Sequence, residues 1–199
     1  RIIVWHLGSG ASITAVKDGK CVATSMGLTP CGGIMMNSRT GDMDPSVYYQ
    51  VLKMSGKTNE EIFQEFNKAS GLYGVSTVSN DSRDVDAEAR KGNHDSLLAM
   101  KLWGRRVADF IGQYFVRLGG CDLIIFSAGI GENAPEYREL VFERINEALG
   151  IKIDNKVNEA TFGGKEAVLS LPESKIKVVV IPTDEEVMIA RDAYNIGCK

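Results

Sequence analysis

The sequence predicts an α/β domain in which a mixed β-sheet is flanked by helices. The last third of the chain alternates short apolar runs with longer amphipathic segments, which is the pattern of strands separated by helices. The first 25 residues instead hold apolar runs joined by glycine-containing turns, and this favours antiparallel strands. Because no internal repeat, low-complexity tract or linker interrupts the chain, we expect residues 1–199 to form a single domain.

Three strands are expected at the start of the chain. Residues 2–5 form the first apolar run, residues 12–16 the second and residues 21–25 the third, and an Asp18-Gly19 turn separates the last two. Residues 26–44 then show no periodicity and are rich in glycine. We expect a functional loop there, because loops of this length inside a compact domain usually carry function.

Helices are expected in the middle of the chain. Asp44 as N-cap, followed by Pro45, predicts a helix over residues 46–54, and a second helix is predicted over residues 59–69. The polar residues 79–84 form a connector that leads into a short charged helix.

The longest predicted helix begins after Asn93 and ends at Gly119-Gly120. Its apolar residues recur every three to four positions and predict a buried face: Leu97, Leu98, Met100, Trp103, Val107, Ile111, Phe115 and Leu118. Further along, strands are predicted over residues 123–126, 151–153 and 178–181, and helices over residues 135–149 and 184–194.

Composition narrows the class of protein. The 23 basic and 26 acidic side chains give a formal charge of −3, which leaves no basic excess for binding nucleic acid. No apolar run approaches the roughly 18 residues of a membrane span and no signal peptide opens the chain, so we expect a cytoplasmic protein with no membrane partner. The scattered cysteines predict reduced thiols and no disulfide or zinc site; they are Cys21, Cys31, Cys121 and Cys198.

Glycine clusters next to strands are candidate phosphate sites. The cluster at residues 8–10 is either a tight hairpin or a loop whose N–H groups and Ser9 hydroxyl bind a phosphate. Gly32-Gly33 forms a second cluster. The third, at residues 129–131, follows a buried strand and precedes a helix with Asn133 at its start, so backbone N–H groups face one point.

The third cluster also allows a dinucleotide-binding interpretation. Gly129-x-Gly131-x-x-Ala134 matches that fingerprint, and Asp154 follows at the distance of a ribose contact. Glu132 argues against it, because its carboxylate would repel a pyrophosphate. The fingerprint also usually opens a domain, whereas some 120 residues precede it here.

Charged residues near these clusters have two explanations each. Arg39 is either a surface charge or a guanidinium that stabilises a transferring phosphoryl group, while Asp42 and Asp44 fit turn and cap roles. His6 is either a satisfied core or hairpin residue or a donor to a phosphate oxygen.

The start of the last helix is also ambiguous. Thr183 and Glu186 fit a capping box. Asp184 and Glu185 either complement the helix dipole or offer a carboxylate to Mg²⁺.

Six motifs stand in order along the chain: HLGSGAS at residues 6–12, TSMGLTP at 24–30, MMNSRTGDMDP at 35–45, SGLYGVS at 70–76, AGIGEN at 128–133 and IPTDEE at 181–186. Together they resemble the C-terminal half of the acetate kinase (acetokinase) family, whose close relatives are propionate and butyrate kinases. The resemblance covers nearly all of the chain. It implies a ribonuclease H-like, actin-like ATPase fold, with nucleotide bound in the cleft between two domains.

The resemblance also implies a reaction. It is the reversible transfer of a phosphoryl group from ATP to acetate, giving acetyl phosphate and ADP, with Mg²⁺ as the metal and Mn²⁺ as its alternative. The chain would be the nucleotide-binding and dimerisation domain of a homodimeric enzyme. The alternatives are a propionate or other short-chain acyl kinase, and a non-catalytic module that binds nucleotide or dimerises through the apolar face of the long helix.

Residue roles follow from the same resemblance. Arg39 would stabilise the in-line transition state, Pro30 would line the pocket for the acetate methyl group, and Glu185 would serve Mg²⁺. The nucleotide-binding residues would be His6, Leu7, Gly8, Ser9 and Gly10 at the phosphates; Asp81, Ser82 and Arg83 at the nucleoside; and Gly129, Ile130, Gly131, Glu132 and Asn133 at adenosine and phosphate.

The chain departs from the family pattern at a few positions. Ser9 replaces a usual asparagine, Asn37 a usual glycine, and Ser82 an aromatic or apolar residue, while Cys31-Gly32 replaces a Leu-Glu pair. The family chain is about twice as long, and its N-terminal half carries another phosphate loop and further catalytic groups. Because Arg1 falls inside a predicted strand, we expect a C-terminal fragment whose N-terminal domain is absent. We expect this fragment to be inactive alone, because half of the charged groups of the family's site would be missing.

Overall fold

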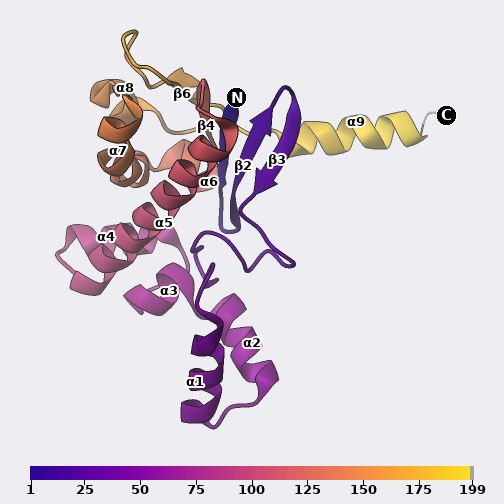
Figure 1. Ribbon diagram of the computed structural model, residues 1–199, viewed down its shortest axis with the longest axis vertical. Coiled ribbons are helices and arrows are strands. Elements are labelled where there is room, and N and C mark those ends of the chain that lie inside the picture. Colours follow the sequence, from indigo (N-terminus) through magenta and orange to yellow (C-terminus); the bar gives the residue numbers. More distant parts are fainter. Residues whose placement is uncertain (198–199) are drawn as a thin grey trace.

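The computed structural model describes residues 1–197, which form a six-stranded mixed β-sheet with helices packed against it (Figure 1). The strand order is β3-β2-β1-β4-β6-β5. The strands are β1 (Ile2–Leu7), β2 (Ala11–Lys17), β3 (Lys20–Thr24), β4 (Leu123–Ser127), β5 (Ala167–Val168) and β6 (Lys177–Val180). β1, β2 and β3 pair antiparallel, as expected, whereas β1, β4 and β6 run parallel.

The predicted helices are present, together with short ones that the sequence pattern did not reveal. The helices are α1 (Pro45–Ser55), α2 (Asn59–Lys68), α3 (Gly71–Ser76), α4 (Ser82–Arg90), α5 (His94–Leu118), α6 (Ala128–Asn133), α7 (Pro135–Leu149), α8 (Asn155–Ala160) and α9 (Glu185–Gly197). The expected caps are confirmed, since Asp44 accepts the Ser46 N–H at 2.8 Å and Asn93 accepts the Ser96 N–H at 2.9 Å. Gly119 ends α5 in the left-handed conformation.

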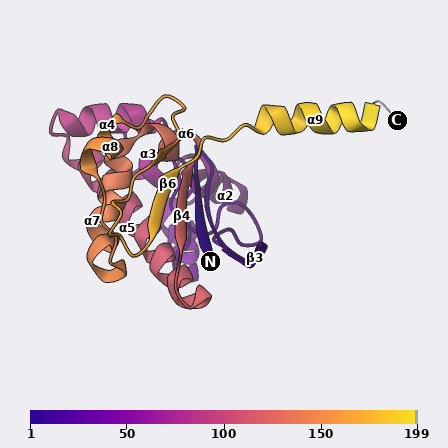
Figure 2. The same cartoon turned by 90° about the horizontal axis from the view of Figure 1, so that it is seen from above.

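The hydrophobic core lies between one face of the sheet and the helices α5 and α7, which lie on the same side of β4 and β6 (Figure 2). Side chains alternate along β1, so that Ile3, Trp5 and Leu7 are buried. An edge-to-face aromatic pair joins the sheet to the helices: the ring centroids of Phe126 on β4 and Phe142 on α7 lie 5.3 Å apart.

Most of the predicted apolar face of α5 is buried in this core, including Trp103, Val107 and Ile111. Leu97 and Leu98, which were predicted on that face, are instead exposed at the start of the helix. The buried part of this face packs inside one chain, so it cannot supply the dimer contact expected of it.

Several local expectations were wrong. Residues 151–153 do not form a strand, because their only pairing is an isolated bridge from Ile153 to Ser170. The glycine cluster at residues 129–131 is helical, in α6. The capping box predicted for Thr183 and Glu186 does not form. Asp184 caps α9 instead, since its carboxylate accepts the Val187 N–H at 3.1 Å, and the Thr183 hydroxyl donates to Glu132.

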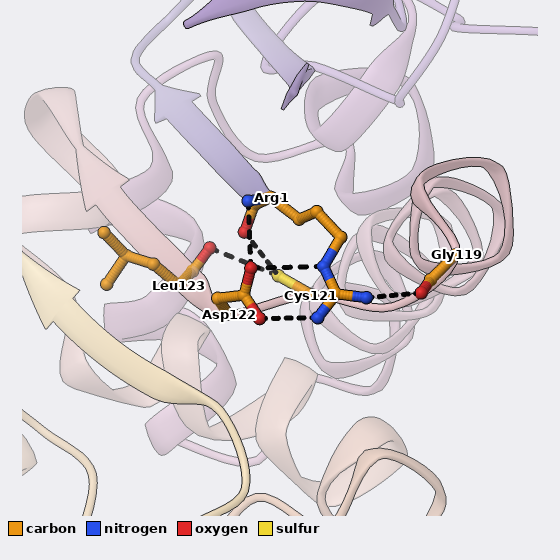
Figure 3. A network of polar contacts seen from close by, with 5 residues as sticks. All are labelled: Arg1, Gly119, Cys121, Asp122 and Leu123. Carbon is orange, nitrogen blue, oxygen red and sulfur yellow. Dashed lines mark hydrogen bonds and ion pairs between the residues drawn. The ribbon is translucent and has the colours of Figure 1, made fainter. Parts of the chain in front are cut away.

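Arg1 lies at the amino end of β1, on the side of the sheet away from the glycine clusters. There its side chain joins the sheet to the end of α5 (Figure 3). Its guanidinium donates to both carboxylate oxygens of Asp122 and to the Gly119 carbonyl. The Arg1 guanidinium holds the pKa of the Asp122 carboxyl well below its usual range. These contacts support the parallel pairing of β1 with β4.

Two parts of the chain project from this body. α1 packs on α2 to form an arm, and α9 extends away from the other elements in both views (Figures 1 and 2). No residue of α1 or α9 is buried. None of the helices within residues 1–197 is long and apolar enough to cross a membrane.

Of the four cysteines, Cys21, Cys31 and Cys121 are free in the structure. Cys198 lies outside the described residues.

Candidate functional site

Three of the predicted segments meet because they follow three adjacent parallel strands. The hairpin at residues 8–10 follows β1, α6 follows β4, and Thr183 to Glu185 follows β6. Ligands of α/β sheets bind beyond the carboxyl ends of parallel strands. Parallel pairing therefore brings together segments that are more than 170 residues apart in the sequence.

A cleft of about 570 Å³ opens at this edge of the sheet. Its size falls within the range of sites for nucleotide-sized ligands. The residues that line it are Gly8, Ser9, Asn37, Ser38, Asn80, Asp81, Ser82, Arg83, Asp86, Gly129, Ile130, Asn133, Ala134, Glu136 and Tyr137.

The long loop places Arg39 against the hairpin. Its Nη1 atom lies 3.5 Å from the Pro30 carbonyl oxygen, and a Cβ at position 10 would lie 3.2 Å from the same Nη1 atom. Gly10 therefore leaves the room that the guanidinium occupies. The loop itself is held by hydrogen bonds, among them that from the Gly33 N–H to Asp42 at 2.8 Å, which confirms the turn role of Asp42.

Backbone packing fixes the Arg39 turn against α3. Gly71 has a φ of 64°, and a Cβ there would collide with the Met36 carbonyl oxygen, which also accepts the Leu72 N–H at 2.9 Å. Glycine is therefore needed at position 71 both for its positive φ and for the close approach of the two backbones.

Asp81 and Arg83 form the opposite wall. The Asp81 carboxylate caps α4 by accepting the Arg83 N–H at 2.9 Å, and it pairs with the Arg83 guanidinium at 2.6 Å. Hydrogen bonds from the Arg83 side chain and backbone lower the pKa of Asp81. Behind them, the buried Tyr137 hydroxyl donates to the Ser82 carbonyl at 3.1 Å, and burial raises the pKa of this tyrosine.

Glu132 turns away from the cleft. Its Oε1 atom accepts the N–H of Ala128 at 2.6 Å and the N–H of Thr183 at 2.9 Å. A carboxylate thus occupies the turn between β4 and α6, where the dinucleotide fingerprint would need to bind a pyrophosphate. This arrangement argues against the dinucleotide interpretation.

His6 and Glu185 lie together at the open end of the sheet. The His6 Nε2 atom is 3.9 Å from a carboxylate oxygen of Glu185, whose side chain is 73% exposed. Within residues 1–197 no group of three or more His, Cys, Asp or Glu side chains is arranged to hold a metal. A single exposed carboxylate nevertheless fits Mg²⁺, which is commonly bound by one or two carboxylates together with substrate phosphates and water.

The structure thus distributes the predicted residues over three places. Gly8, Ser9, Asp81, Ser82, Arg83, Gly129, Ile130 and Asn133 line the cleft. Pro30, Arg39 and Gly10 meet beside it, and His6 meets Glu185. Leu7 has its side chain in the core, Gly131 packs against Phe126, and Glu132 lies in the buried network described above.

Sequence reasoning did not assign several residues of the cleft wall. Tyr137 reads as an ordinary core position of an amphipathic helix, and Asn80 as part of a polar connector. Asn37 was recognised only as a departure from the family pattern. This residue is 6% exposed, and its buried Oδ1 atom has no hydrogen-bond partner within the described residues, so it remains free to accept a hydrogen bond.

The strand order and the cleft at the carboxyl ends of β1 and β4 define an actin-like, ribonuclease H-like α/β domain, the fold class expected from the sequence. The acetokinase family model matches residues 1–191, and the chain belongs to this family.

Individual relatives agree with this assignment. The chain is 48% identical over 199 residues to acetate kinase of Acholeplasma laidlawii, which covers 100% of this chain and 50% of that protein. The crystal structure of Porphyromonas gingivalis acetate kinase matches with a TM-score of 0.92 and 44% identity, over 98% of this chain and 49% of that one. A propionate kinase structure from Francisella tularensis matches with a TM-score of 0.88 and 39% identity, over 96% and 48%. The chain spans about half the length of the curated relatives it matches.

Proposed function

We propose that this chain is the nucleotide-binding domain of an acetate kinase, which transfers the γ-phosphoryl group of ATP to acetate and gives acetyl phosphate and ADP. The observation that carries the proposal is the meeting of Arg39, Pro30 and Gly10 beside a cleft of about 570 Å³. Membership of the acetokinase family supports it independently.

In this proposal each wall of the cleft holds one part of the nucleotide. The N–H groups of the hairpin and the Ser9 hydroxyl bind phosphate oxygens, while Asp81 and Arg83 face the nucleoside. The acetate oxygen attacks the γ-phosphorus as the bond from that phosphorus to the ADP oxygen breaks. Arg39 stabilises the charge on the transferring group, and Pro30 contacts the acetate methyl group.

The proposed metal is Mg²⁺, with Mn²⁺ as a possible substitute, and Glu185 would hold it. When bound, the metal neutralises charge on the phosphate oxygens. His6, 3.9 Å from Glu185, would donate to a phosphate oxygen.

A propionate kinase is the second candidate, favoured by the similarity to the Francisella tularensis structure. One methylene in an apolar pocket discriminates by only about 1–3 kcal/mol. An assay of the full-length protein with ATP and each of acetate, propionate and butyrate separates the candidates. We expect the highest kcat/KM with acetate, and no acyl phosphate from any of them would overturn the proposal.

We further propose that the isolated 199-residue chain binds Mg·ATP but forms little acetyl phosphate, because the family's N-terminal half carries further groups of the site. Calorimetric titration with Mg·ATP tests this. Absence of binding at millimolar nucleotide would leave a dimerisation module. A titration with NADH should show no binding.

A homodimer and a cytoplasmic location complete the proposal. The three described cysteines are free thiols, as is usual in a reducing compartment. Since the apolar face of α5 is buried, the dimer would use other surfaces, and exposed apolar side chains on the arm are available for it: Val47, Tyr49, Met54 and Phe63. Light scattering of the purified protein measures the oligomeric state.

A further inference from the structure

One buried carboxylate connects two segments of the site. Glu132 is 9% exposed, and its Oε1 atom accepts three hydrogen bonds: from the Ala128 N–H at 2.6 Å, the Thr183 N–H at 2.9 Å and the Thr183 hydroxyl at 3.2 Å. Within residues 1–197 no Lys, Arg or His side chain forms an ion pair with it. The Glu132 carboxylate is therefore stabilised by backbone N–H and hydroxyl donors, which make strong charge-assisted hydrogen bonds.

The first bond holds the nucleotide side of the cleft. Ala128 has a φ of 63°, a conformation that is strained for a residue with a side chain. The bond from its N–H to Glu132 stabilises this turn of β4 into α6. Gly129 and Ile130 follow directly and line the cleft.

The other two bonds hold the segment that leads to Glu185. Thr183 stands two residues before Glu185, and Asp184 between them caps α9. Because α9 buries no residue, it gains no fixed position from packing within residues 1–197. The bonds from Thr183 to Glu132 on α6 are the last hydrogen bonds that join this segment to the rest of the described domain before α9 begins.

We infer that Glu132 is a positioning residue, which ties Thr183 to the start of α6 and thereby holds the Glu185 carboxylate beside His6. This inference rests on the proposed function, since it assigns a purpose to the position of Glu185. It differs from a nucleotide contact, because the Glu132 carboxylate does not line the cleft and its Oε1 atom is already used by three donors.

The test compares three variants of the full-length protein in binding of Mn²⁺ in the presence of ADP, measured by electron paramagnetic resonance. Glu132→Ala should weaken Mn²⁺ binding roughly tenfold or more, which is the usual effect of removing a group that orients a metal ligand. Glu132→Gln should keep most of the affinity, because its amide oxygen can accept the same donors. Thr183→Val removes only the hydroxyl bond and should show a smaller loss. Glu139→Ala, an exposed glutamate on α7, is the matched control and should bind Mn²⁺ like the wild type.

A double-mutant cycle with Glu185→Ala separates positioning from general damage. If Glu132 acts through Glu185, Glu132→Ala should have little further effect on Mn²⁺ affinity in the Glu185→Ala background. Equal losses in both backgrounds would overturn the inference. Amide hydrogen exchange gives a readout without metal: the Thr183 N–H should exchange faster in Glu132→Ala than in the wild type, and unchanged exchange would also overturn it.

The two failures are distinguishable. A wild-type protein that binds no Mg·ADP contradicts the proposed function. A wild type that binds Mn²⁺ with ADP, and a Glu132→Ala variant that binds it equally well, contradicts only the positioning role. If Glu132→Ala does not fold, Thr183→Val decides. This variant keeps the backbone N–H at position 183 but loses the hydroxyl bond to Glu132, and an Mn²⁺ affinity equal to that of the wild type would contradict the positioning role.

Discussion

The Tyr137 hydroxyl donates to the Ser82 carbonyl at 3.1 Å and so joins α7 to the first turn of α4. Both residues are buried and both line the cleft. This bond is the inner support of the wall that carries Asp81 and Arg83, and it links the stability of the core to the shape of the proposed nucleoside site.

Tyr137→Phe should lower the free energy of unfolding by about 1 kcal/mol, because it removes one hydrogen bond and leaves the Ser82 carbonyl without that donor. Urea unfolding of the purified chain measures the change. Tyr194→Phe, which alters an exposed tyrosine on α9, should have no effect and serves as control. Equal stability of wild type and Tyr137→Phe would show that this bond contributes nothing.

The same side chain predicts a loss of stability at alkaline pH. Burial raises the pKa of Tyr137 above its ordinary value of 10.0, so the unfolded chain releases this proton at lower pH than the folded chain. The contribution is therefore fully present below pH 10.0 and is lost as pH rises above it. The free energy of unfolding, measured between roughly pH 8 and 11, should fall less steeply in Tyr137→Phe. Burial also raises the pKa of Tyr114 and of the Cys121 thiol, so some dependence of the same sign should remain in the variant.

Sequence patterns predicted what depends on local order. The Asp18-Gly19 turn, the cap at Asn93 and the strand over residues 123–126 follow from neighbouring residues, and each is confirmed. α8 and β5 were missed because they are only six and two residues long, too short for periodicity to appear.

The direction of the Glu132 side chain could not be predicted in the same way. It depends on Thr183, which is 51 residues away in sequence. The motif at residues 128–133 identifies a segment of the site, but it does not say whether a given side chain faces the ligand or the core. The same is true of Leu7, whose motif lies at the site although its side chain is in the core.

Arg39→Ala should lower kcat of the full-length protein by roughly a hundredfold to a thousandfold while changing the Kd for ATP much less, because the guanidinium is assigned to charge that develops in the transition state. Steady-state kinetics and calorimetry measure the two quantities. Arg39→Lys should recover only part of the rate, since an ammonium lacks the planar fork. An unchanged kcat in Arg39→Ala would remove the assigned role.

Gly10→Ala should displace the Arg39 guanidinium without unfolding the protein. A Cβ at position 10 would lie 3.2 Å from Nη1, at the far end of a flexible side chain that can move away. We expect kcat to fall by up to roughly tenfold, because small misplacements of a positioning group are costly. Gly112→Ala, where a Cβ meets open space on α5, is the control and should keep the wild-type kcat. If both variants behave alike, Gly10 does not set the position of Arg39.

Arg138→Met should be the most destabilising of these substitutions. The Arg138 guanidinium is buried, with its residue 1% exposed, and it donates to the side chain and the carbonyl of Asn158 at 2.8 Å each. It also donates to the carbonyls of Gly131 at 2.9 Å and Thr161 at 2.7 Å, so it joins α6, α7 and α8 behind the cleft.

No carboxylate accepts from Arg138 within residues 1–197, and burial lowers its pKa to about 10, which leaves it charged at neutral pH. Removing the guanidinium leaves several buried carbonyls without donors, and each such group costs about 1–3 kcal/mol. We therefore expect a loss of roughly 3 kcal/mol or more in urea unfolding. Arg138→Lys should recover little, because one ammonium cannot reach the acceptors on α6 and those on α8 and its C-cap together. Arg105→Met, an exposed arginine on α5, should change stability by less than about 0.5 kcal/mol, and a similar small change in Arg138→Met would contradict the structural role of this network.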